Sequence, residues 1–137
     1  TPGEKTVVFA VVGDMMLLPV LEATAALAEA GIGSKVVALV SPRRLYRSTD
    51  VAWETCKNSD GTFLDDDAFN TLFAGDALIG VTGGSSAMLE PVILRSTLPR
   101  DVMAWKRGET TSSAGKLFAF NGLTQEALVN RAKTLLG

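Results

Sequence analysis

The segment Thr6–Val12 (TVVFAVV) constrains the fold most, because it is an almost continuous run of β-branched and aromatic residues. Such a run is typical of a strand that is buried on both faces, as strands are in a parallel sheet. Gly13 and Asp14 end the run, and a helical pattern follows over 17–30. A strand, a tight turn and a helix in this order predict a βα unit at the start of the sequence.

The predicted helix over 17–30 carries its apolar residues three and four positions apart, while Glu22 and Glu29 mark the opposite face. Pro19 lies in the first turn, where its missing N–H costs least, and Gly31 is a typical end signal. The residues expected to face the core are Leu17, Val20, Leu21, Leu27 and Ala28, with Thr24 as the one polar member.

Further strands are predicted along the chain. Lys35–Ser41 (KVVALVS) repeats the buried-strand pattern, and its short connection to the preceding helix fits a right-handed βαβ crossover. Asp76–Thr82 (DALIGVT) and Asp101–Lys106 (DVMAWK) are the third and fourth predicted strands. Leu117–Phe120 is a candidate short edge strand.

Further helices are predicted between and after these strands. Asp65–Phe73 combines an acidic first turn with a small apolar face. Ser85–Arg95 has a helical pattern, but Pro91 requires that this helix either starts late or kinks. Thr124 is the expected N-cap of the last helix. Its core-facing residues are predicted to be Leu128, Ala132 and Leu135.

These elements predict a three-layer α/β/α fold, in which helices cover both faces of a mostly parallel sheet of about four or five strands. The length of 137 residues and a hydrophobic share of 47% suit a single α/β domain over 1–137. No apolar run reaches the ~20 residues of a membrane span, so we expect no membrane partner. A net charge of −2 argues against a nucleic-acid partner.

The inventory of catalytic side chains is small. The sequence has no histidine, so imidazole cannot act as a general base or a metal ligand. The single Cys56 allows no disulfide within the chain, no Cys-x-x-Cys redox pair and no thiolate zinc site. We therefore expect no catalytic residue, metal site or cofactor site within this domain, and a reducing, cytoplasmic location.

Ligands of such folds lie beyond the carboxyl ends of the strands, which directs attention to the loops there. Gly13-Asp14 lacks the G-x-G-x-x-G pattern of dinucleotide sites, so a plain turn with Asp14 capping the helix is favoured. Asp65, Asp66 and Asp67 are consecutive and point in different directions on a helix, which favours an acidic first turn over a metal cluster. The loops of interest are Gly13–Met16, Ser41–Arg44, Thr82–Ser86 and Arg107–Lys116.

Two polar segments remain as candidate binding sites, each with two interpretations. Gly83, Gly84 and Ser85 offer backbone N–H groups to an anion, or form a tight turn with a serine cap. The segment that begins at Lys106 and Arg107 combines cations with hydroxyl groups. It suits a phosphate or an acidic segment of another domain, or is a solvated loop.

Three segments resemble the C-terminal domain of phosphoketolases, which belong to the transketolase-like group of thiamine-diphosphate enzymes. Ala104–Ser113 (AWKRGETTSS) resembles the late segment of that family, in which an aromatic-lysine pair precedes a run of threonines. Phe69–Gly84 looks like its Phe-x-x-Leu-Phe stretch with the strand and glycine that follow. Val7–Leu27 resembles the first strand, Gly-Asp turn and helix. The similarity covers most of the chain.

The resemblance implies a parent enzyme, a lyase of carbohydrate metabolism, that cleaves xylulose 5-phosphate or fructose 6-phosphate with phosphate. Its products are acetyl phosphate and an aldose phosphate. In the family, thiamine diphosphate and Mg²⁺ lie between the other two domains, so this domain is expected to bind neither. The implied partners are the other domains of the same enzyme and a second copy in a homodimer.

The resemblance also directs the choice of site residues. The catalytic histidines of the family belong to the other domains, so none carries over to this chain. Lys106, Thr110 and Thr111 match the late motif and are expected to make an interdomain or phosphate contact. Arg107 and the Gly83–Ser85 turn complete the predicted site.

Alternative functions stay open at this point. Thr82-Gly83-Gly84 stands where phosphoketolases often carry an aromatic-His-Gly segment, which leaves room for another branch of the transketolase group. A free-standing module could bind a small anionic ligand with Gly83–Ser86 and Arg107–Ser113. A docking domain, as in 2-oxoacid dehydrogenase subunits, would expose a sizeable apolar patch.

Overall fold

The described strands form one parallel sheet. The computed structural model describes residues 4–40, 42–45, 64–105 and 123–137. Within these residues the sheet is four-stranded with the order β2-β1-β3-β4, and every pairing is parallel. Its strands are β1 (Thr6–Val12), β2 (Gly33–Ala38), β3 (Ala77–Thr82) and β4 (Arg100–Met103). The candidate strand Leu117–Phe120 lies outside the described residues.

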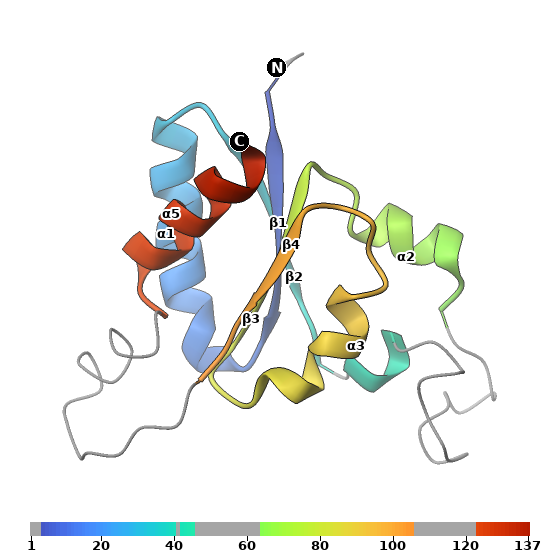
Figure 1. Ribbon diagram of the computed structural model, residues 1–137. Coiled ribbons are helices and arrows are strands. Elements are labelled where there is room, and N and C mark those ends of the chain that lie inside the picture. Colours follow the sequence, from blue (N-terminus) through green and yellow to red (C-terminus); the bar gives the residue numbers. More distant parts are fainter. Residues whose placement is uncertain (1–3, 41, 46–63, 106–122) are drawn as a thin grey trace, which may run out of the picture.

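Helices cover both faces of the sheet, which confirms the predicted three-layer α/β/α architecture (Figure 1). α1 (Leu17–Glu29) and α5 (Gln125–Leu136) lie on one face, and α2 (Asp66–Leu72) and α3 (Glu90–Ile93) lie on the other. Alternate residues of β1 face opposite sides, so Phe9 belongs to the core under α1 and α5, whereas Val8 belongs to the core under α2 and α3.

The strand boundaries follow the apolar runs of the sequence. β1 has the predicted bounds, and β3 lacks only the predicted first residue. β4 begins one residue before the predicted start and ends at Met103. β2 differs in both position and burial. It spans Gly33–Ala38 instead of the predicted 35–41, and as an outer strand of the described sheet it has only half-buried or exposed residues. The prediction of a second fully buried strand was therefore wrong.

The face of α1 that contacts the core also differs from the prediction. Val20, Ala23 and Leu27 are buried, whereas Leu21 and Ala28 are exposed. The helix is apolar around most of its circumference, so periodicity alone does not select one face. Packing against the sheet and α5 selects the row that contains Ala23, a residue missing from the predicted set.

Pro91 determines where α3 begins. The predicted helix over 85–95 is divided into the 3-10 turn η5 (Ser86–Met88) and the short α3, in which Pro91 occupies the first turn. A proline is tolerated there because the N–H groups of the first turn have no partner within the helix. The helix therefore starts late, which is one of the two solutions that the sequence allowed.

Polar caps begin both α2 and α5; the cap by Thr124 was predicted, whereas for α2 the prediction was an acidic first turn. Asp65 Oδ1 accepts the backbone N–H of Ala68 at 2.7 Å, and Asp66 and Asp67 follow in the first turn of α2. Thr124 Oγ1 accepts the N–H of Ala127 at 3.3 Å at the start of α5. These contacts give the acidic and hydroxyl residues at both positions a structural role.

An ion pair joins α5 to β4, the last strand in the described part of the sheet. Arg131 Nε donates to Asp101 Oδ2, and Asp101 Oδ1 accepts the N–H of Val102 at 2.8 Å. Asp101 therefore accepts a backbone N–H of β4 and also binds Arg131 of α5. None of the helices in the described ranges is both long and apolar enough to cross a membrane.

Candidate functional site

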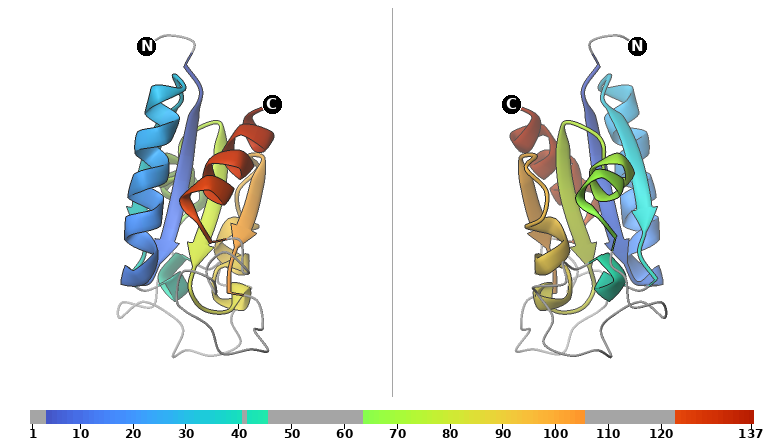
Figure 2. Two further views of the ribbon diagram at one scale, coloured as in Figure 1. Left: turned by 90° about the vertical axis from the view of Figure 1, so that its left-hand side faces the viewer. Right: turned by 90° about the vertical axis from the view of Figure 1, so that its right-hand side faces the viewer.

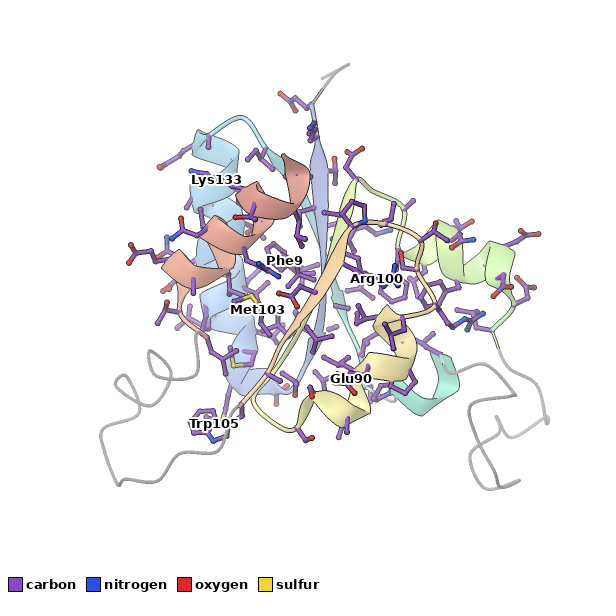
Figure 3. The ribbon with its side chains drawn as sticks, in the orientation of Figure 1. Phe9, Glu90, Arg100, Met103, Trp105 and Lys133 are labelled. Atoms are coloured by element: carbon purple, nitrogen blue, oxygen red, sulfur yellow. The ribbon has the colours of Figure 1, made fainter. Side chains whose placement is uncertain are left out.

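Three connections meet at the carboxyl end of the sheet, as expected for a parallel α/β fold. The 3-10 turn η1 (Asp14–Met16) follows β1, the turn at Gly83 follows β3, and Trp105 lies just beyond the end of β4 (Figure 3). The N–H of Trp105 donates to the carbonyl of Gly84 at 3.0 Å. A Cβ added at Gly83 would lie 3.9 Å from Met16 Sδ, so this turn also adjoins η1.

The turn after β1 is built around a glycine-specific conformation. Gly13 has φ 96° and ψ 135°, a region that side chains disfavour, and its carbonyl accepts the N–H of Met16 at 3.3 Å. Asp14 is the first residue of η1, and neither η1 nor α1 receives a hydrogen bond from a capping side chain. The predicted cap by Asp14 was wrong, because η1 separates this residue from the start of α1.

The turn after β3 is held by its own polar groups. The buried Thr82 accepts the N–H of Gly84 on Oγ1 at 3.0 Å. Ser85 caps η5, since its Oγ accepts the N–H of Ala87 at 3.2 Å. The geometry is therefore a tight turn with a serine cap, in which the N–H of Gly84 already has an acceptor. A contact with an anion at Gly83, Gly84 and Ser85 stays a prediction.

The described part of this edge has hydroxyl groups but no arrangement that activates one of them. Ser86 Oγ donates to Glu90 Oε1 at 3.0 Å, and both residues lie on the η5–α3 connection at the surface. Nucleophilic catalysis requires a base that is itself oriented and desolvated. Among the described residues, no group of three His, Cys, Asp or Glu side chains could hold a metal ion.

The cationic part of the predicted site begins at Lys106, directly after Trp105, which is the last described residue beyond β4. Trp105 is half-buried, and it packs with Met103 against the core under α1 and α5. Figure 3 shows Met103 on β4, facing α5. Because Trp105 is hydrogen-bonded to Gly84, the glycine turn lies beside the residue that precedes the cationic segment. The site residues outside the described ranges are Lys106, Arg107, Thr110 and Thr111.

One buried cation was not recognised in the sequence. The side chain of Arg95 is 3% exposed, and its guanidinium lies 4.5 Å from the ring centre of Phe69. It donates to the carbonyls of Leu45 and Leu64 at 2.7 and 2.8 Å. The signal was an arginine directly after the apolar run Val92–Leu94, but nothing in that pattern identifies distant carbonyls as its partners.

Comparisons with known proteins place this chain by its fold. No family model matches the sequence, and no curated protein matches it. Solved structures do match, and one is described as a split gene transketolase, an inactive beta4 tetramer. It is 20% identical in sequence with a TM-score of 0.66, and the match covers 97% of this chain.

The same match covers 40% of the transketolase chain. The chain thus spans less than half the length of that protein. Nearly all of this chain shares the fold of the part that it matches. The expected transketolase-like architecture is therefore confirmed. At this identity the likeness concerns the fold, so activity, cofactor and substrate are separate questions.

Proposed function

We propose that this chain is the C-terminal, non-cofactor-binding domain of a phosphoketolase-like enzyme. The observation that carries the proposal is the unequal coverage, 97% of this chain against 40% of a transketolase chain. A fold that accounts for only part of such an enzyme suits a module that serves chemistry located in other domains. The resemblance of Ala104–Ser113 to the late phosphoketolase segment supports a phosphoketolase rather than another member of the transketolase-like group.

The parent enzyme would cleave xylulose 5-phosphate or fructose 6-phosphate with inorganic phosphate, as a thiamine-diphosphate-dependent lyase of the cytoplasm. The domain would contribute packing against the other domains and against a second copy in a homodimer. Lys106, Arg107, Thr110 and Thr111 would contact phosphate or a neighbouring domain, next to the turn at Gly83–Ser85.

The described residues do not fit thiamine diphosphate and Mg²⁺. A diphosphate needs several free N–H donors or cations, but the N–H of Gly84 already donates to Thr82 Oγ1, and the turn Thr82–Ser86 contains no lysine or arginine. No cluster of carboxylate ligands for a divalent ion occurs within the described ranges. We therefore propose that other domains of the parent enzyme bind the cofactor.

The test is an assay of the native polypeptide that carries Thr1–Gly137, supplied with thiamine diphosphate and Mg²⁺. With xylulose 5-phosphate and inorganic phosphate, the proposal predicts acetyl phosphate, detected as its hydroxamate. Replacing phosphate by ribose 5-phosphate distinguishes a transketolase, which would transfer the two-carbon unit to the sugar.

Two results would contradict the proposal at different levels. Two-carbon transfer to ribose 5-phosphate without acetyl phosphate would retain the transketolase group but overturn the phosphoketolase assignment. A native polypeptide that begins shortly before Thr1 and forms neither product would favour the alternative of a free-standing anion-binding module.

A further inference from the structure

α1 carries a second apolar row besides the residues that it buries in the core. Figure 2 shows that α1 forms part of one outer layer of the fold. The second row consists of Leu18, Leu21, Ala25 and Ala28, all exposed, and is called here the outer stripe. Leu18 is 65% exposed and Leu21 is 54% exposed, so these two side chains contribute little to the core of this chain. An exposed row of leucines at helical spacing is typical of a surface that another molecule or segment covers.

The outer stripe is separate from the face that α1 presents to the core. The buried row contains Met16, Val20, Ala23 and Leu27. Successive residues of an α-helix are turned by about 100°, which places the two rows on nearly opposite sides of the helix. One apolar row of α1 thus packs in the core of this chain, and the described residues leave the second row exposed.

The spacing of the outer stripe indicates a helical partner. Its members follow one another by three, four and three residues, the repeat by which two helices pack side by side. Ala25 and Ala28 are small and form the second half of the stripe, so a partner helix can approach closely there. A strand, with its repeat of two residues, would not match this row.

The charges beside the outer stripe indicate which helix can pair with it. Glu22 and Glu29 are seven residues apart, so they form one acidic row along the stripe, and both are exposed. α1 contains no lysine or arginine. Two copies packed antiparallel would bring these acidic rows together. Packed parallel, they would set the glutamates against Leu17 and Thr24, which carry no opposite charge.

We propose that the outer stripe binds an amphipathic helix whose apolar row is flanked by lysine or arginine, rather than a second copy of α1. The contact covers only about two heptads, so its affinity in free solution is low. It becomes effective when the partner helix belongs to the same assembly and is held at high local concentration. The inference does not depend on the proposed enzymatic function, because it rests on α1 alone.

The test uses two synthetic helical peptides with the same leucine-alanine row, one flanked by lysine and the other by glutamate. Each is titrated into the ¹⁵N-labelled 137-residue chain, and amide shifts are followed by NMR. The lysine peptide is expected to shift the amides of residues 18–28 and to bind about fivefold more tightly than the glutamate peptide, with the difference lost at high salt.

Variants make the test specific. Leu18→Gln with Leu21→Gln is expected to abolish the shifts, while Leu94→Gln, an equally exposed leucine near α3 on the other face of the sheet, leaves them unchanged. Glu22→Lys with Glu29→Lys is expected to reverse the peptide preference.

Three results would overturn the proposal. The first is no shift over 18–28 with the lysine peptide. The second is an unreversed preference in the Glu22→Lys, Glu29→Lys variant. The third is self-association of the unmodified chain that the Leu18→Gln change abolishes, which would identify a second copy as the occupant. None of these readouts involves thiamine diphosphate or a sugar phosphate, so they are independent of the enzymatic assay.

Discussion

The Arg95 guanidinium joins three parts of the chain that are distant in sequence. It donates to Leu45 at the end of η2 (Pro42–Leu45), to Leu64, and to Asp66 Oδ1 at 2.9 Å. Leu45 and Leu64 are the described residues on either side of the range 46–63, so one side chain holds both ends of that connection. A planar, permanently charged group suits this role, because it offers several donors in fixed directions.

Arg95→Met should lower the free energy of unfolding by about 3 kcal/mol, because it leaves two carbonyls without their charged donor in a buried site. Arg95→Lys should recover only part of this loss, since one ammonium cannot reproduce the geometry of the guanidinium. Urea denaturation of both variants measures the effect. Arg100→Met, at an exposed arginine, is the matched control and should change stability by less than about 0.5 kcal/mol. Equal effects of Arg95→Met and Arg100→Met would contradict the assignment.

Gly13→Ala should destabilise the fold by about 1–3 kcal/mol through backbone strain alone. No atom lies within 4 Å of a Cβ added there, so a steric clash contributes nothing, whereas the positive φ of 96° disfavours any side chain. Thermal unfolding of the variant checks this expectation. An unchanged melting temperature would mean that the turn after β1 adopts another conformation.

At the scale of elements, close packing of α3 on β3 depends on Gly80. A Cβ at this position would lie 2.9 Å from Ile93 Cγ1 and 3.3 Å from Leu89 Cδ1, in the core under α2 and α3. Glycine therefore permits the short helix to approach the strand directly.

Gly80→Ala should reduce stability by about 1–3 kcal/mol, because α3 has to move away from the sheet. Gly84→Ala is the control, since its Cβ would meet only Thr82 Oγ1 at the ordinary distance of 3.6 Å. Denaturant titrations of the two variants give the comparison. If Gly84→Ala were the more harmful substitution, the described packing of α3 would be wrong.

The elements that could be predicted from the sequence are those in which local pattern and tertiary environment agree. β1 is recognised because a β-branched run suits the centre of a parallel sheet. β2 has the same pattern but lies at the edge, and its position in the strand order depends on pairing between distant residues. The face of α1 was missed in part because the helix carries two apolar rows, and only contact with the sheet and α5 distinguishes them.

At the scale of the whole molecule, the sequence predicted the three layers, whereas the candidate site stays a prediction. The Gly83–Ser85 turn and the end of β4 lie together because the carboxyl ends of parallel strands share one edge. Arg95 was missed because its role depends on two carbonyls from remote segments. The contact partners of Lys106, Arg107, Thr110 and Thr111 remain predictions, since these residues lie outside the described ranges.

If other domains hold the cofactor for the chemistry that this chain serves, the chain alone should not bind that cofactor. Calorimetric titration of the 137-residue chain with thiamine diphosphate in the presence of Mg²⁺ tests it most directly. We expect only the heat of dilution, because the N–H of Gly84 already donates to Thr82 Oγ1 and no group of three metal-binding side chains occurs among the described residues. A saturating isotherm with micromolar affinity would contradict this expectation.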